Sequence, residues 1–154
     1  MKLSPQTHGP VTLSKIDYAA SMSEETVAFT GEISITVDGK TLKASVRNDG
    51  RGGPNCIQDH ACSRAISDYA KTLPDDPTEY GSIKMSADYL ISMMVANALT
   101  AKDDSKYKKK GFTHGISASH PTKGEVAFYA KGAPTVEMFK KMGVEEATAK
   151  VRTL

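Results

Sequence analysis

Apolar and polar residues alternate along the first third of the chain with the two-residue period of β-strands. This alternation predicts a first strand at 11–19 and a second at 27–37. Asp38-Gly39 follows and predicts a type I′ turn, since both central residues of that turn need positive φ. The chain then returns through a third strand at 40–47. The side chains expected to face inward from the second and third strands are Val27, Phe29, Gly31, Ile33, Ile35, Val37, Leu42, Ala44 and Val46.

The spacing of apolar residues changes to that of helices in the middle of the chain. Steps of four residues predict a helix at 57–73 that ends at Pro74, because proline disfavours helical backbone in the preceding residue. Ser86 is placed to cap a second helix that runs to Leu99, and the polar segment PDDPTEYGS separates the two. The inward-facing residues expected on these helices are Ile57, Ala61, Ala65, Tyr69, Leu73, Tyr89, Leu90, Met93, Met94 and Ala96.

The last third of the chain returns to strands and is predicted to end in a helix. The charged run KDDSKYKKK, at 102–110, is expected to be exposed, and strands are expected at 112–119 and 125–131. Pro134 suits the first turn of a final helix at 136–151. Strands gather early and helices mostly later, without regular alternation of the two. The chain is therefore predicted to be a single α+β domain, 1–154, with an antiparallel sheet and about three helices packed on one face.

Length and composition exclude several classes of protein. The 154 residues are the size of one domain, and the formal net charge of +2 does not indicate a nucleic-acid polymer or a membrane as partner. No apolar run is long enough to span a bilayer, and the N-terminus lacks the apolar core of a signal peptide. Cys56 and Cys62 fit neither a zinc motif nor a disulfide framework. We therefore expect a soluble cytoplasmic protein.

The segment NDGRGGPN, at 48–55, is the most unusual stretch of the chain, because three glycines and an arginine directly follow a strand. One interpretation is an anion site, in which glycines allow close approach to backbone N–H groups and Arg51 contacts a phosphate. The other is a wide turn in which Asn48 and Asp49 bond to their own backbone. The P-loop and Rossmann fingerprints are both missing. Both interpretations stay open at this level.

Other candidate chemistry is weaker. The lysine run with Tyr107 and Phe112 is either a solvated loop or a source of phosphate attraction and base stacking. No metal spacing links the four histidines, and no serine or cysteine nucleophile stands in a recognisable catalytic order. We therefore expect no catalytic residue, no metal and no cofactor. The histidines are His8, His60, His114 and His120.

A strand, a "DGK" hairpin and a strand ending in "NDGRGG", within VAFTGEISITVDGKTLKASVRNDGRGGPN at 27–55, resemble a group of small phage-encoded α+β proteins. The group is that of the viral nucleotide sponges, which counter CBASS and Thoeris immunity by sequestering cyclic nucleotide or cyclic ADP-ribose signals. The polar segment PDDPTEYGS and the lysine run depart from the group's pattern.

The resemblance implies a homo-oligomer that binds a cyclic nucleotide-type signal in the host cytoplasm, without cleaving it. Arg47 and Arg51 would hold phosphate, and Lys110 would add charge. The other residues implied are Asn48, Asp49 and Asn55 for ribose or base edges, Gly50, Gly52 and Gly53 for close backbone approach, and Tyr107 or Phe112 for stacking. The alternatives are an inhibitor that binds a host defence enzyme through the same loop and, with less support, a nucleotide-processing enzyme.

Overall fold

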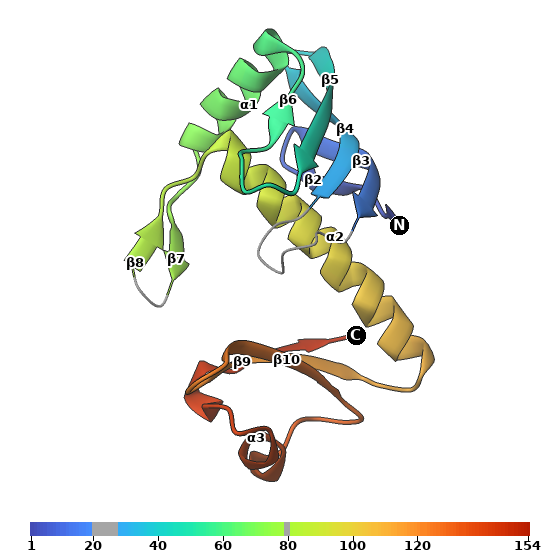
Figure 1. Ribbon diagram of the computed structural model, residues 1–154, viewed down its shortest axis with the longest axis vertical. Coiled ribbons are helices and arrows are strands. Elements are labelled where there is room, and N and C mark those ends of the chain that lie inside the picture. Colours follow the sequence, from blue (N-terminus) through green and yellow to red (C-terminus); the bar gives the residue numbers. More distant parts are fainter. Residues whose placement is uncertain (20–27, 79–80) are drawn as a thin grey trace. The chain divides into compact units, whose positions relative to one another are not determined.

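An antiparallel meander and three helices make this an α+β fold (Figure 1). The computed structural model describes residues 1–19, 28–78 and 81–154, so Val27 and two residues of the polar segment, Glu79 and Tyr80, lie outside the described residues. The chain divides into two compact units, the N-terminal unit (Met1–Thr100) and the C-terminal unit (Ala101–Leu154).

The sheet of the N-terminal unit follows the predicted meander. Its strands are β1 (Lys2–Leu3), β2 (Gln6–His8), β3 (Val11–Ala19), β4 (Ala28–Val37), β5 (Lys40–Asp49) and β6 (Cys56–Ile57). The order is β1-β3-β4-β5-β6, all antiparallel, with β2 also paired to β3. Asp38 and Gly39 have φ of 50° and 77°, which confirms the predicted positive-φ turn. The third strand runs two residues further than expected, since Asn48 and Asp49 still pair with β4.

The first helix, α1 (His60–Lys71), begins later than predicted. Ile57 belongs to β6 instead, and the side chain of Asp59 caps the helix by accepting from the Cys62 backbone N–H at 2.8 Å. Ala65, Tyr69 and Leu73 are partly buried and pack against the core as predicted. Cys62, Ile66 and Ala70 are buried, whereas Ala61 is exposed.

The second helix, α2 (Ala87–Lys109), starts where it was predicted and ends ten residues later than the predicted Leu99. Ser86 Oγ accepts from the Tyr89 N–H at 3.1 Å, which confirms the predicted cap. Leu90 and Met94 are buried as predicted, whereas Ala96 is exposed. The other buried positions are Ile91, Val95 and Ala98. The charged run is therefore helix rather than loop, because no glycine or proline interrupts it before Gly111.

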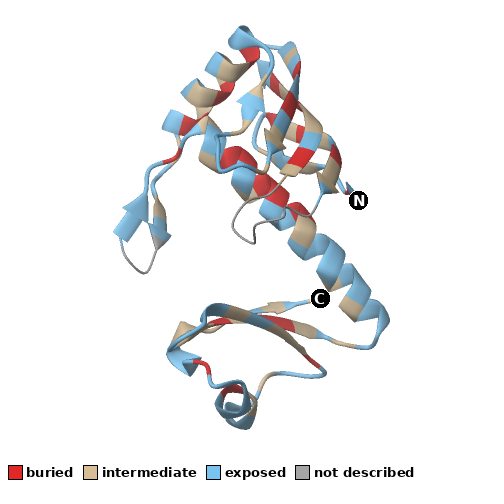
Figure 2. Ribbon diagram, in the orientation of Figure 1, coloured by how far each residue is buried: buried red, intermediate tan, exposed pale blue. Residues whose placement is uncertain are grey.

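The core of the N-terminal unit lies between the sheet and the helices, which Figure 1 shows on one side of the sheet. Figure 2 shows buried residues along α1, the first half of α2 and the strands. Phe29, Ile33 and Ile35 are at most 3% exposed, but Val37 is 44% exposed because it lies at the hairpin end. The polar segment is not a plain loop, since it contains a small hairpin of β7 (Asp76–Thr78) and β8 (Gly81–Ile83).

The C-terminal unit has its own sheet and core. Its elements beyond α2 are β9 (His114–His120), β10 (Gly124–Ala130), α3 (Val136–Met142), the 3₁₀ turn η1 (Glu146–Thr148) and β11 (Lys150–Thr153). The sheet order is β10-β9-β11, antiparallel. The predicted helix at 136–151 is wrong beyond Met142, because Gly143 takes the left-handed conformation, with φ of 69°, and ends it. The buried residues are Ile116, Ala118, Ala130, Phe139 and Val144.

Candidate functional site

A polar hollow of about 360 Å³ lies in the N-terminal unit, over the middle of β3, β4 and β5. It is lined by Lys15, Thr30, Gly31, Glu32, Ser45, Val46, Arg47 and Gln58. Arg47 is the one predicted site residue in this lining. Its strand position is exposed, and among the described residues its guanidinium has no hydrogen bond or ion pair.

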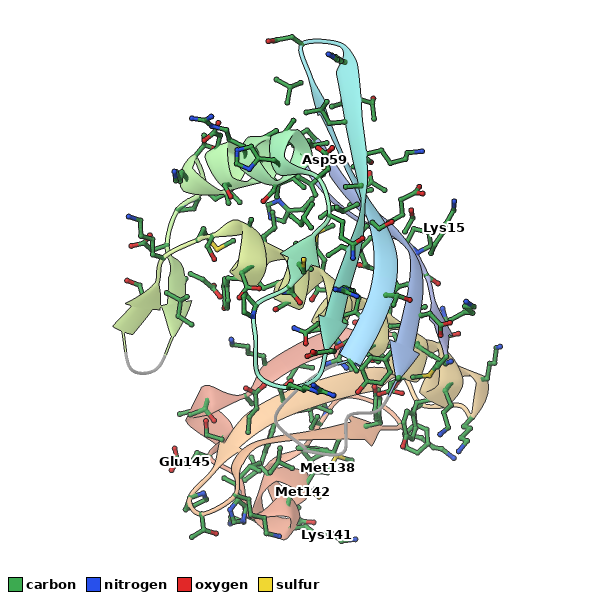
Figure 3. The ribbon with its side chains drawn as sticks, turned by 45° about the horizontal axis from the view of Figure 1, so that its top comes forward. Lys15, Asp59, Met138, Lys141, Met142 and Glu145 are labelled. Atoms are coloured by element: carbon green, nitrogen blue, oxygen red, sulfur yellow. The ribbon has the colours of Figure 1, made fainter. Side chains whose placement is uncertain are left out.

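A β-bulge in β3 positions Lys15 at this hollow. The register of β3 against β4 shifts between Ser14 and Asp17, so that Lys15 and Ile16 together oppose Gly31. Lys15 takes the positive φ of 52°, which a non-glycine residue rarely adopts. The extra residue lets Ile16 stay fully buried while Lys15 is exposed, and Figure 3 shows Lys15 projecting away from the strands.

Gly31 is small for a steric reason. A Cβ at this position would lie 3.2 Å from the Ser14 carbonyl oxygen and 3.5 Å from Leu13 Cδ1. The bulged strand therefore approaches β4 where β4 has no side chain. A glycine inside a strand is a known sign of a bulge. This is the signal from which sequence reasoning could have found Lys15 and the hollow.

Cations outnumber carboxylates in and beside the hollow. Glu32 lies 3.3 Å from Lys15 Nζ and 3.5 Å from Lys43 Nζ. Burial by itself raises the pKa of Glu32, but the bonds and charges of Lys15 and Lys43 outweigh it and hold that pKa below its usual value. One ionised carboxylate thus faces two lysines, with Arg47 as a further cation in the lining. The arrangement favours an additional anion.

The glycine loop is ordered by its own side chains. Asn48 Nδ2 donates to the Gly53 carbonyl at 3.1 Å and to Asn55 Oδ1 at 3.1 Å, and Asn48 Oδ1 accepts from the Gly50 N–H at 2.9 Å. Asp49 Oδ1 accepts from the Arg51 N–H at 3.0 Å. These side-chain bonds to nearby backbone are the ones expected if the loop is a wide turn.

Asn55 ties the end of this loop to α2. Its backbone N–H donates to Asp88 Oδ1 at 2.6 Å, and its side-chain amide donates to the Asp88 carbonyl at 3.0 Å and to Ser92 Oγ at 2.9 Å. Asn48 and Asn55 therefore hold the loop in place, and these contacts occupy the polar groups expected to meet a ribose or a base. Arg51 is exposed, and among the described residues its guanidinium has no hydrogen-bond or ion-pair partner.

The predicted stacking residues lie in the C-terminal unit. Tyr107 stacks on Tyr129 with ring centroids 4.0 Å apart, and Phe112 meets Tyr107 edge-on at 5.5 Å. Lys110 Nζ lies 5.5 Å from the centroid of the Tyr107 ring. These three predicted residues gather into one cluster with Tyr129, separate in the sequence and in the division into units from the loop of Arg47 to Asn55.

Three of the four histidines, His8, His114 and His120, have hydrogen-bond partners within the fold. His8 Nδ1 bonds to the Tyr69 hydroxyl at 2.9 Å, and His120 Nδ1 accepts from the Thr122 N–H at 3.1 Å. Within ranges 1–19, 28–78 and 81–154, no group of three or more His, Cys, Asp or Glu side chains is placed to hold a metal ion. Burial raises the pKa of the Cys62 thiol, which is opposite to the change that activates a nucleophile.

The part of the chain that the structure describes contains no helix with the length and apolar character needed to cross a membrane. A scan against protein-family models and searches of curated proteins and of solved structures find no match to this chain.

Proposed function

We propose that this protein binds a phosphorylated nucleotide-type ligand at the polar hollow of the N-terminal unit and releases it unchanged. The observation that carries the proposal is the Arg47 guanidinium, which lines the hollow without an ion-pair partner among the described residues. A guanidinium is planar and always charged, and it matches a phosphate with two parallel hydrogen bonds.

The other lining residues suit the rest of a nucleotide. Lys15 adds a point charge, while the hydroxyls of Thr30 and Ser45 and the amide of Gln58 offer donors and acceptors for a sugar or a base edge. The volume of about 360 Å³ falls in the range of small-molecule sites.

The same lining supports the proposal of intact release. It contains one carboxylate, Glu32, which is engaged by Lys15, and it contains neither a histidine nor a cysteine. General acid–base hydrolysis needs a positioned base beside a nucleophile or a metal, and this lining does not supply such a pair.

The resemblance to phage nucleotide sponges extends the proposal to a cyclic nucleotide or cyclic ADP-ribose signal, bound in the host cytoplasm by a homo-oligomer. Most of the apolar face of the β4–β5 hairpin is buried within the chain, so the proposed oligomer would form mainly through other surfaces. Exposed apolar side chains are available in the C-terminal unit, at Val136, Met142 and Val151. Light scattering tests this extension, and a monomer at micromolar concentration would remove it.

The first experiment is a thermal-shift panel of cyclic dinucleotides, cyclic trinucleotides and cyclic ADP-ribose isomers, since a ligand that binds the folded state stabilises it. For a ligand that stabilises the protein, Arg47→Ala should lose about 1.5 to 3 kcal/mol of affinity, as for the loss of hydrogen bonds to a charged group. Arg47→Lys should recover part of this loss. Arg64→Ala removes an exposed arginine of α1 outside the hollow and should bind normally.

Unchanged affinity in Arg47→Ala would contradict the proposed site. Denaturation after incubation should return unmodified nucleotide, and a hydrolysed product would favour the enzyme alternative instead. Arg51→Ala tests separately whether the glycine loop contacts the ligand, because its guanidinium is exposed and outside the lining of the hollow.

A second candidate function is an inhibitor that binds a host defence enzyme. The observation in its favour is that the glycine loop is exposed at Arg51 and ordered by its own side chains, as a preformed protein-binding loop would be. If no nucleotide stabilises the protein, and a host enzyme is inhibited by the wild type but not by Arg51→Ala, this second function holds.

A further inference from the structure

The division into units separates the charges of the chain. Residues 1–100 hold nine lysines and arginines against twelve aspartates and glutamates, a formal charge of −3. Residues 101–154 hold eleven lysines and arginines against six acidic residues, a formal charge of +5. The modest +2 of the whole chain therefore hides a strongly basic C-terminal unit. Such a charge draws anionic partners towards that unit.

Part of this charge gathers around the aromatic cluster of the C-terminal unit. The ammonium groups of Lys106 and Lys110 lie 5.8 and 5.5 Å from the centroid of the Tyr107 ring, and that of Lys131 lies 5.3 Å from the Phe112 ring. A cation over an aromatic face is attracted by the ring quadrupole. The rings therefore hold three lysines from different parts of the unit close to one surface.

The end of α2 extends this surface. Lys102, Lys106 and Lys109 are exposed and recur at steps of four and three residues, which places them on one side of the helix over about 10 Å. We call Lys102, Lys106, Lys109, Lys110 and Lys131 the basic surface. In the described part of the C-terminal unit the ion pair is between Arg152 and Asp104, so no lysine of the basic surface is paired with a carboxylate.

The acidic residues of the same helix turns do not neutralise these lysines. Asp104 accepts two bonds from Arg152 and one from the Tyr129 hydroxyl. Asp103 is exposed and forms no ion pair among the described residues. The basic surface therefore keeps an excess of positive charge.

Helix electrostatics explain only some of this arrangement. Lysines in a last turn are favourable because the carbonyl end of a helix is partly negative, and this accounts for Lys106 and Lys109. It does not account for Lys131, which follows β10 and whose ammonium lies 5.3 Å from the centroid of the Phe112 ring. Lys131 thus brings a cation from a second element to the same aromatic cluster as the lysines of α2. Lysines gathered from two elements suit an anion that extends across both.

We propose that the basic surface binds the phosphate backbone of a nucleic acid. Charge complementarity favours a nucleic acid, because five unpaired lysines on α2, in the turn after it and just after β10 match a row of phosphates better than a single phosphate. Tyr129 and the lysines lie against the Tyr107 ring, so the rings position cations instead of stacking on bases. Binding is therefore independent of base sequence. This inference does not rest on the hollow of the N-terminal unit.

The test uses the full chain and a short fluorescein-labelled duplex DNA, with anisotropy measured over a series of salt concentrations. About three to four phosphate contacts predict a slope of roughly −3 for log K against log salt, and a second duplex of unrelated sequence should bind equally. Lys106→Gln/Lys110→Gln/Lys131→Gln should weaken binding at least about tenfold at low salt and flatten the slope. The melting temperature of this triple variant should stay close to that of the wild type, because all three side chains are exposed.

The matched control is Lys123→Gln/Lys140→Gln/Lys141→Gln, which removes the same charge from the β9–β10 turn and from α3. It should keep wild-type affinity and slope. An equal loss in this control would show that only net charge matters, and would overturn the assignment to the basic surface. If the protein does not bind DNA at low salt, the proposal is wrong. The same holds if it binds vesicles of anionic lipid but not DNA.

Discussion

At the scale of single residues, Asp104 joins the end of α2 to the last strand of the C-terminal unit. Its carboxylate accepts from Arg152 Nε at 2.8 Å and from Arg152 Nη2 at 2.7 Å, and from the Tyr129 hydroxyl at 2.8 Å. Burial, followed by the bond to Asp104, raises the pKa of Tyr129 to about 12, so this hydroxyl keeps its proton at neutral pH. Gly115 leaves room for the pair, because a Cβ there would lie 2.6 Å from Arg152 Cζ.

Asp104→Asn should destabilise the C-terminal unit by about 2 kcal/mol at neutral pH, as for the loss of hydrogen bonds to a charged group. The bonds from Arg152 hold the pKa of Asp104 below its usual value. The stability that the carboxylate contributes is therefore present above about pH 4 and lost as pH falls through the lower folded-state pKa. Urea unfolding of wild type and variant over a pH series should show the difference shrink in acid. A difference that stays constant in acid would contradict the role of the charge.

The β-bulge also makes a prediction for one residue. Gly31→Ala should cost about 1 to 3 kcal/mol of stability, as for overpacking, because the new Cβ meets the Ser14 carbonyl at 3.2 Å. Gly53→Ala is the control, since nothing lies within 4 Å of a Cβ there and its φ is not in the left-handed region. Thermal unfolding compares the two. Equal melting temperatures would mean that the bulge relaxes around the methyl group.

At the scale of elements, helix ends depend on single side chains. The Asp59 carboxylate satisfies the Cys62 N–H at the start of α1, and Thr135 Oγ1 accepts from the Met138 N–H at 3.4 Å at the start of α3. Gly143 ends α3 in the left-handed conformation. These contacts fix the residues at which α1 and α3 begin and at which α3 ends.

Asp59→Ala should lower the stability of the N-terminal unit by about 1 kcal/mol, which is typical for the loss of an N-cap. Asp59→Asn should retain most of the stability, because an amide oxygen accepts the same bond. Figure 3 shows Asp59 just before α1. Asp68→Ala, on the exposed side of the same helix, should have little effect. Chemical unfolding measures all three, and an Asp59→Ala variant as stable as Asp68→Ala would rule out the cap as a stabilising contact.

At the scale of the whole molecule, the chain has two hydrophobic cores that share no residue among those described. Ile66 and Ile116 are fully buried in the N-terminal and C-terminal cores, respectively. Ile116→Val should cost about 1 kcal/mol, as for one buried methyl group. Hydrogen exchange should then speed up in β9 and β10 and remain unchanged in β4 and β5, with the reverse for Ile66→Val. Equal acceleration in both sheets for either variant would indicate one cooperative unit.

The sequence by itself determined the strands β3, β4 and β5, the Asp38-Gly39 turn and the Ser86 cap. Each of these rests on a signal within a few residues: alternation, a turn dipeptide or a cap just before an apolar periodic segment. The α+β class follows from the order of these elements. The end of α3 at Gly143 was missed by the predicted helix at 136–151, although glycine after a lysine-rich last turn is a common helix stop.

Only the tertiary structure decided the candidate sites. Lys15 reaches the hollow through a register shift against β4, and Asn55 is held by Asp88 and Ser92, more than thirty positions away. The segment at 150–153 is a strand because it pairs with the free edge of β9. Its own spacing of apolar residues did not predict a strand. The basic surface likewise required Lys131 to return beside the end of α2. Pairing and hydrogen bonding between remote segments depend on the whole packed chain, and local spacing does not carry that information.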